Sequence, residues 1–138
     1  MPKIEGACLC GAVKYSSPAE PVLEAVCHCE NCQRQAGTAF SVVVGVPASS
    51  LKIEGEENVA TYQDRGDSGK SVQRRFCRNC GSPIVSVVEV APDLLFIKSG
   101  TLNDRSWLDP KLHIWCDSAQ PWYEIPKGTQ QLPQSPPG

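Results

Sequence analysis

Apolar residues in this chain come in short runs separated by turn-forming residues, and sustained helical periodicity is scarce. Runs of four to eight β-branched and aromatic residues bounded by Gly, Pro, Asn or Asp are typical of short β-strands. The clearest run, Ala39 to Val46, is rich in valine and ends at Pro47. On this basis we expect strands at residues 11–15, 22–26, 39–46, 51–54, 59–63, 72–76, 84–88, 94–98 and 112–116.

Helical signals are confined to short segments. Residues 30–36 predict a helix that stops at Gly37, because glycine is favoured just after a helix end. Residues 103–107 predict a turn, and the polar residues 64–70 predict the tip of a long hairpin. Gly and Pro account for 23 of the 138 residues, which favours many turns over long helices. The chain is therefore expected to be mainly β, with few short helices.

Length and composition indicate one domain with a tail. The chain has 138 residues, of which 41% are hydrophobic, and this is enough to bury a core. No internal repeat or linker interrupts it. Residues 129–138 hold three glutamines and three prolines but one leucine, too few apolar groups to offset the entropy of ordering. We therefore expect a single zinc-binding domain at residues 1–128 and a disordered C-terminal tail at residues 129–138.

Charge and hydropathy argue against two classes of partner. The formal net charge of −2 gives no clustered basic surface for nucleic acid. Arg74, Arg75 and Arg78 lie close together, and we interpret them as a solvated strand edge and as donors to cysteine sulfur. No apolar run approaches the roughly 20 residues of a membrane span, and residues 1–14 do not resemble a signal peptide. A cytoplasmic protein without membrane or nucleic-acid partners is expected, and its oligomeric state is left open.

Seven of the eight cysteines fall into three tight clusters, which are Cys8-Leu9-Cys10, Cys27-His28-Cys29-Glu30-Asn31-Cys32 and Cys77-Arg78-Asn79-Cys80. A disulfide framework requires an oxidising compartment that nothing in the sequence indicates, and the ring closed by Cys-x-Cys is strained. Thiolates at these spacings are typical zinc ligands. An iron–sulfur cluster on the middle set is the alternative that ligand softness also permits.

The number of clustered cysteines predicts two kinds of metal site. A closed structural zinc site uses four thiolates, and a site with one open position uses three. Spacing alone leaves two pairings open: Cys77 and Cys80 can join Cys8 and Cys10, or they can join two cysteines of the middle cluster. The first pairing is simpler, because the middle cluster then forms a local three-thiolate site within six residues.

The cysteine motifs occur in the order Gly6–Val13, Cys27–Gly37 and Phe76–Gly81, and are followed by Gly100–Asp104 and by His113–Trp115 with Trp122-Tyr123. In this order, over roughly residues 4–128, they resemble the glutathione-dependent formaldehyde-activating enzyme family, also called the Gfa or centromere-protein-V-like family. The resemblance implies an Mss4-like fold of twisted antiparallel sheets with zinc-ribbon-like knuckles.

The resemblance also implies a division of the ligands and a reaction. It assigns a structural zinc to Cys8, Cys10, Cys77 and Cys80, and a second, catalytic zinc to Cys27, Cys29 and Cys32. Two Zn²⁺ per chain are then expected, with glutathione as co-substrate. The implied reaction is of carbon–sulfur lyase type and forms or breaks adducts between a small thiol and an aldehyde such as formaldehyde. The alternative is a non-catalytic, zinc-stabilised protein-interaction module.

The remaining candidate residues are expected to be structural. His28 lies between two ligands, so its side chain should point away from the metal. His113 is expected to be a buried, hydrogen-bonded core residue, and Cys116 a buried thiol that binds no metal. For the aromatic residues near the C-terminus, core packing is the favoured expectation and the wall of a substrate pocket is the alternative; these residues are Trp107, Trp115, Trp122 and Tyr123.

Overall fold

The structure, a computed structural model, describes residues 4–66 and 69–134. Within these ranges the α-helix is α1 (Glu30–Ala36). The strands are β1 (Ile4–Ala7), β2 (Lys14–Ser17), β3 (Leu23–Cys27), β4 (Ser41–Pro47), β5 (Lys52–Glu54), β6 (Val59–Arg65), β7 (Ser71–Cys77), β8 (Pro83–Val88), β9 (Leu94–Lys98), β10 (Leu112–Ile114) and β11 (Gln130–Gln131). None of the described helices is long and apolar enough to cross a membrane.

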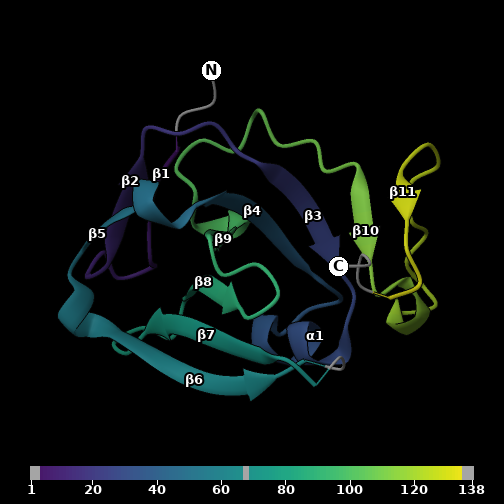
Figure 1. Ribbon diagram of the computed structural model, residues 1–138, viewed down its shortest axis with the longest axis horizontal. Helices are drawn as coiled ribbons and strands as arrows, with labels where there is room; N and C mark the ends of the chain where they lie inside the picture. The colour runs from purple at the N-terminus through teal and green to yellow at the C-terminus, as the bar shows by residue number, and fades with distance from the viewer. Residues whose placement is uncertain (1–3, 67–68, 135–138) are drawn as a thin grey trace.

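The strands form a small sheet and a large sheet (Figure 1). The small sheet has the order β1-β2-β5, and the large one has the order β11-β10-β3-β4-β9-β8-β7-β6. Neighbouring strands are antiparallel except that β10 runs parallel to both β3 and β11. In Figure 1 the large sheet curves from β10 through β3 and β4 to β7 and β6, and α1 lies near the end of β3 beside the β6–β7 hairpin.

The hydrophobic core lies between the small sheet and one face of the large sheet. Alternate residues of a strand point to opposite faces, so Val44 and Val46 of β4 and Ile97 of β9 are fully buried in one cluster with Ile4 and Tyr15. The neighbouring positions of β4 and β9 point to the opposite face. One face of the large sheet therefore stabilises the fold, and the other is available for a binding site.

Gly6 shows how closely the small sheet approaches the chain that follows β9. A Cβ atom at this position would overlap both the Tyr15 hydroxyl and the carbonyl oxygen of Thr101. The Tyr15 hydroxyl also hydrogen-bonds the Thr101 hydroxyl at 2.7 Å. A glycine is required here because two segments far apart in the sequence meet with no room for a side chain.

The mainly β architecture and its short helix are confirmed. The helix spans the expected residues 30–36 and ends at Gly37, whose φ of 72° is left-handed. Strand β1 was not expected, and the strand expected at residues 11–15 begins only at Lys14. The reason is a turn after β1 in which Cys8 N donates to Val13 O at 3.0 Å. The strand expected to end at Cys116 stops at Ile114.

Part of the expected disordered tail is ordered. Residues 130–131 form β11, and Cys116 N donates to Leu132 O at 3.0 Å. Backbone hydrogen bonds hold this segment although its side chains are polar. Amino-acid composition carries no information about such bonds. Residues 135–138 of the expected tail, and residues 67–68 of the expected hairpin tip, lie outside the described residues. The division of the chain at residue 128 stays a prediction.

Candidate functional site

Four cysteines from two distant turns meet at the edge of the molecule. Cys8 and Cys10 follow β1, Cys77 ends β7 and Cys80 lies in the turn before β8, with all four sulfur atoms within 4.8 Å of one another. The Cys8–Cys10 and Cys10–Cys77 sulfur separations are both 3.7 Å. A tetrahedron of sulfur atoms about 2.3 Å from zinc has edges of about 3.8 Å. This group, which we call the four-thiol group, therefore has the spacing of a closed metal site.

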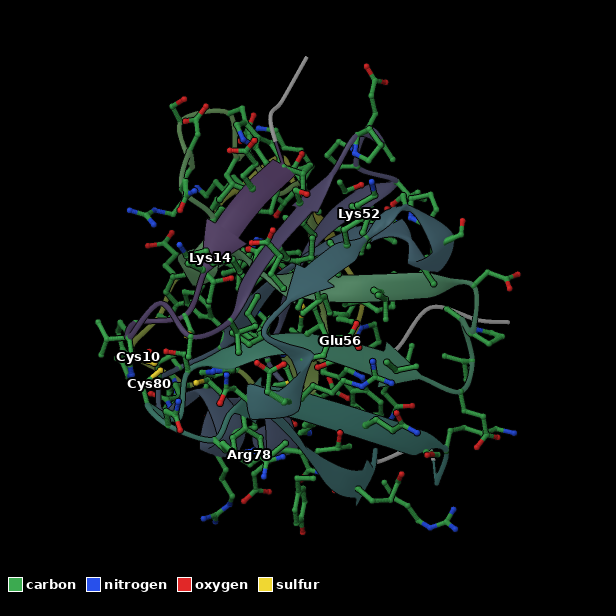
Figure 2. All side chains as sticks on the ribbon, turned by 90° about the vertical axis from the view of Figure 1, so that its left-hand side faces the viewer. Cys10, Lys14, Lys52, Glu56, Arg78 and Cys80 are labelled. Atoms are coloured by element: carbon green, nitrogen blue, oxygen red, sulfur yellow. The ribbon has the colours of Figure 1, made fainter. Side chains whose placement is uncertain are left out.

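Backbone and hydroxyl donors around the four-thiol group favour thiolate sulfur. Val13 N donates to Cys8 Sγ at 3.3 Å, and the Ser82 hydroxyl lies 3.2 Å from Cys80 Sγ. The hydrogen bond from Ser82 lowers the pKa of the Cys80 thiol to about 5. Figure 2 shows Cys10 and Cys80 together at one edge of the molecule. A metal held here would tie the small sheet to the large one.

Three further cysteines converge within six residues. Cys27 is the last residue of β3, Cys29 caps α1, and Cys32 lies in the first turn of the helix. Their sulfur atoms lie within 4.8 Å of one another, and all three side chains are buried. Cys32 N donates to Cys29 Sγ at 3.2 Å, so the sulfur takes the place of the usual oxygen cap. We call this set the three-thiol group.

Two buried cations flank the three-thiol group. Arg74 is 4% exposed, and its Nη1 lies 3.8 Å from Cys32 Sγ while its Nε donates to Asp64 at 2.8 Å. Lys98 is 8% exposed, and its Nζ donates to Ser41 Oγ at 2.9 Å. Buried charges require such partners. The site therefore places two positive charges where thiolate charge is expected.

The cations and the neighbouring thiols together favour negative charge on sulfur. Hydrogen bonds from Cys27 and Cys29, supplemented by the charges of Lys98 and Arg74, lower the pKa of the Cys32 thiol to about 2. The hydrogen bonds to the other two thiols raise the pKa of Cys27. Burial lowers the pKa of Lys98, and the charge at Cys32 opposes that shift. Metal ligation requires deprotonated cysteine, so this environment suits a bound cation.

The three-thiol group lies at one end of a cavity of about 350 Å³. The cavity is formed by the face of the large sheet that points away from the core, and it is closed by β10 and the residue after it. Its buried polar lining consists of Arg74, Ser86 and Lys98. Gly66, Lys70, Ser71 and Glu89 also line it. The rest of its lining is mainly apolar and comes from Leu23, Ala25, Val43, Val72, Val88, Val90, Ala91, Leu94, Phe96, Leu112, Ile114 and Trp115.

Trp115 has an unusual backbone and packs against the three-thiol group. Its φ is 57°, and it is the one non-glycine residue with positive φ in the part of the chain that the structure describes. This conformation is unfavourable for a bulky residue and marks sites where the surroundings impose it. Trp115 also lines the cavity. The turn therefore positions an aromatic ring beside the thiols at the expense of backbone strain.

The histidines take the structural places that the sequence predicted. His28 Nε2 lies 3.0 Å from His113 Nδ1, both rings are buried, and Tyr123 and Phe40 pack around His28. Burial lowers the pKa of both imidazoles. His28 therefore points away from the thiols into an aromatic cluster, which fits its place between two ligands.

The remaining candidates divide between core and surface. Cys116 belongs to neither thiol group; it is half-buried, and its thiol donates to His113 O at 3.5 Å. Trp107 packs against the main core, whereas Trp122 is 71% exposed. Core packing was wrong for Trp122, whereas Trp115 takes the alternative place in the wall of a cavity. Burial of Arg74 likewise corrects the expectation of a solvated strand edge, although its contact with Cys32 confirms the expected donor role.

Sequence reasoning missed the polar cavity residues Lys98 and Ser86, and it missed Ser41, whose hydroxyl accepts a hydrogen bond from Lys98. A signal for Lys98 was present, because alternation places it on the same strand face as Leu94 and Phe96. A lysine that ends an apolar face of a strand is unusual unless it faces a site. No comparable signal existed for the two serines, because their neighbours are set by the pairing of strands.

Comparison with known proteins places these features in context. The model of a family described as glutathione-dependent formaldehyde-activating enzyme matches residues 3–118. An uncharacterized lyase of Schizosaccharomyces pombe is 32% identical over 84 residues, which are 61% of this chain and 57% of that protein. An Aspergillus flavus protein named for the same enzyme family is 26% identical over 88 residues, which are 62% of this chain and 44% of that protein. The chain thus spans about half the length of the curated relatives it matches.

A solved structure supports the fold. The crystal structure of a Rhodobacter sphaeroides protein, a structural genomics target, matches with a TM-score of 0.60 at 22% sequence identity. The match covers 80% of this chain and 99% of that chain. At this identity the likeness concerns the fold alone.

Proposed function

The chain belongs to the glutathione-dependent formaldehyde-activating enzyme family, and from this premise we propose that it is a zinc-dependent enzyme of carbon–sulfur lyase type. It would form or break adducts between a small, glutathione-like thiol and an aldehyde such as formaldehyde. The observation that carries the proposal is the three-thiol group at the end of a cavity, flanked by Lys98 and Arg74. A purely structural metal would not need a cavity beside its ligands.

The ligand sets support two zinc ions per chain. The four-thiol group would hold a structural zinc, because four thiolates close the coordination tetrahedron. The three-thiol group would hold the catalytic zinc through Cys27, Cys29 and Cys32, with one position left toward the cavity. Zinc bound there supplies a Lewis-acid position that favours the thiolate form of a substrate thiol.

The adduct reaction joins the substrate sulfur to the carbonyl carbon of the aldehyde. As the carbon–sulfur bond forms, the π electron pair of the carbonyl moves to oxygen, and that oxygen takes up one proton while the thiol releases one. The Lys98 ammonium lines the cavity beside the thiols, and we assign it the stabilisation of the oxygen as negative charge develops. Preorganised donors of this kind are usually the largest electrostatic contribution to catalysis.

The other residues around the group hold its charges in place. Asp64 accepts from Arg74 at 2.8 Å and from Asn31 Nδ2 at 3.2 Å, so the guanidinium is fixed between a carboxylate and Cys32. Ser86 Oγ is buried in the cavity lining and has no hydrogen-bond partner among the described residues. It is therefore a second donor available to a substrate oxygen.

The test is catalysed exchange of formaldehyde between its free and thiol-bound forms. With ¹³C-formaldehyde and a panel of small thiols that includes glutathione, exchange spectroscopy by NMR separates the catalysed rate from the spontaneous one. With at least one of these thiols we expect faster exchange for the parent protein and for Cys116→Ser, and the spontaneous rate for Cys29→Ser. Native mass spectrometry of the reduced protein should find two zinc ions in the parent and one in Cys29→Ser.

Cobalt substitution separates this proposal from the protein-interaction module. Addition of a thiol substrate should change the visible spectrum of the cobalt in the three-thiol group. Two results together would overturn the enzymatic proposal and favour the interaction module. They are a cobalt spectrum that no small thiol changes, and exchange rates that stay at the spontaneous value for thiols and aldehydes of all sizes.

A further inference from the structure

We propose that the cavity binds a thiol or aldehyde that carries an apolar chain or ring beside its reacting atom, and that glutathione itself is a poor ligand. This inference rests on the proposed function for the reaction, and on the cavity walls for the choice of substrate. The shared chemistry is a hydrocarbon group of several carbons next to the reacting sulfur or carbonyl carbon.

Strand register arranges the cavity from a polar end to an apolar end. Cys27 of β3 is paired with Ser41 of β4 at the polar end. In the next cavity-facing row, Val43 of β4 is paired with Ala25 and with Lys98. Lys98 is therefore the only charged residue of β9 on the cavity face, and it lies at the end of β9 that is nearer the thiols.

Beyond Lys98 the lining formed by β3, β4 and β9 is apolar. Gly45 is paired with Leu23 on one side and with Phe96 on the other. A Cβ at Gly45 would lie 3.2 Å from Leu23 Cγ and 3.3 Å from Phe96 Cε1, which is tighter than ordinary packing. Leu23 and Phe96 thus close over Gly45 to make one continuous apolar surface. Leu94 and Val88 also line the cavity and extend this apolar part.

The buried charged residues that line the cavity are placed to contact the reacting group of a substrate, and they do not match the charges of a peptide such as glutathione. Arg74 is held by Asp64 and Cys32, and Lys98 lies beside the thiols. The other charged lining residues, Lys70 and Glu89, are exposed and opposite in sign. Glutathione carries two carboxylates and an ammonium group, and burying such charges along an apolar wall without partners is strongly unfavourable.

An apolar substituent would instead gain from the same wall. Burial of one methylene group is worth about a threefold to fourfold gain in affinity. The cavity, at about 350 Å³, lies at the small end of the range for ligand sites. The reacting group would lie near Lys98, and its tail would follow Leu23 and Phe96, which is paired with Ser86, toward Leu94.

Binding is measured on the zinc-loaded protein by displacement of an anilinonaphthalene dye, a readout that does not depend on turnover. The ligands are linear thiols of two to six carbons, linear aldehydes of two to eight carbons, the matching unreactive alcohols, and glutathione. We expect the Kd of at least one reactive series and of the alcohols to fall about threefold to fourfold per added carbon until the cavity is full. The reactive series that shows this dependence identifies which reactant carries the chain.

Two variants of Leu23 tie the effect to the wall. Leu23→Ala should weaken hexanethiol or hexanal about tenfold while two-carbon ligands change little, and Leu23→Glu should abolish the dependence on chain length. Val22→Glu is the matched control, because Val22 is adjacent, is 57% exposed and does not line the cavity. Circular dichroism verifies that each variant folds, and the alanine variant keeps the test valid if the glutamate variant does not.

The outcomes separate this inference from the proposed function. Chain-length dependence without any adduct formation would support the apolar ligand and refute the lyase chemistry. Catalysed exchange with glutathione, combined with Kd values that do not vary with chain length, would overturn the apolar ligand and leave the lyase chemistry standing. Equal effects of Leu23→Ala and Val22→Glu on hexanethiol and hexanal would also overturn it.

Discussion

Replacing Arg74 with methionine tests whether the buried guanidinium supports the three-thiol group. Arg74 joins β7 to the helix, since its Nε donates to Asp64 at 2.8 Å and its Nη1 lies 3.8 Å from Cys32 Sγ. Methionine keeps much of the volume and removes both contacts. We expect Arg74→Met to lower both the stability of the fold and the affinity for zinc.

The expected loss follows from what remains after the substitution. Removing one partner of a buried ion pair costs about 3–5 kcal/mol, because the other charge is left uncompensated. The Asp64 side chain is 18% exposed and keeps its hydrogen bonds from Asn31 and from Arg65 N at 2.8 Å, which places the loss at the lower end. We therefore expect about 3 kcal/mol of lost stability. Loss of a partner that orients a metal ligand also weakens metal binding by about 10-fold to 100-fold.

Urea unfolding in the presence of zinc and a reductant measures the first effect, and competition with a chelator measures the second. For an m-value of about 1.5 kcal/mol per molar urea, the midpoint should fall by about 2 M. Arg34→Met is the matched control, since Arg34 pairs with Glu30 at 3.2 Å on the exposed face of α1 and such pairs contribute little. A midpoint within about 0.3 M of the parent, with unchanged zinc affinity, would refute the reasoning.

Three further predictions concern the two thiol groups and the histidine pair. Cys77→Ser should be insoluble or lack a cooperative unfolding transition, because Cys77 is fully buried and belongs to the four-thiol group that joins the two sheets. The control Cys116→Ser should unfold like the parent protein. A soluble Cys77→Ser protein that unfolds cooperatively would contradict this. Exhaustive chelation should abolish the near-ultraviolet circular dichroism spectrum, because the four-thiol group links distant turns, and retention of that spectrum would count against the link. Burial lowers the pKa of His28 and His113, so below about pH 6.5 the unfolded state binds more protons than the folded state does. The free energy of unfolding should therefore fall with falling pH, by at most about 1.4 kcal/mol per pH unit for each histidine. Urea midpoints between pH 7.5 and 5.5 measure this slope, which His113→Gln should reduce, and a midpoint that rises as the pH falls would be incompatible with it.

Local patterns were sufficient for much of the secondary structure. Helix α1 was predicted because its residues and Gly37 supply both a helix and its stop signal within eight residues. Strand β1 was missed because it is only four residues long, with one β-branched residue and a glycine. The end of β10 was missed because the left-handed backbone of Trp115 is imposed by its surroundings and is not a preference of tryptophan.

The candidate site likewise has a part that local sequence indicates and a part that only the fold determines. Cysteine spacing favoured a local three-thiol group, because a strand end, a helix cap and a first helical turn are close whenever they follow one another. It left a second pairing open, and only the family resemblance chose between the two. The cavity could not be predicted, since it requires the order of the strands in the large sheet. Lys98 approaches the thiols only because β9 lies beside β4 and β4 lies beside β3. Strand neighbours that are distant in sequence leave no local signal.

The large sheet also explains why stability and ligand choice should be separable in this protein. Ile97 points into the core, while Phe96 and Lys98 on either side of it point into the cavity. The four-thiol group contacts the core cluster through Cys8 and Cys77, whereas the three-thiol group packs against Trp115 on the cavity side. Substitutions on the cavity face can therefore change the ligand while leaving the core and its metal ligands intact. This separation allows one fold to keep its four-thiol group while the walls of its cavity vary.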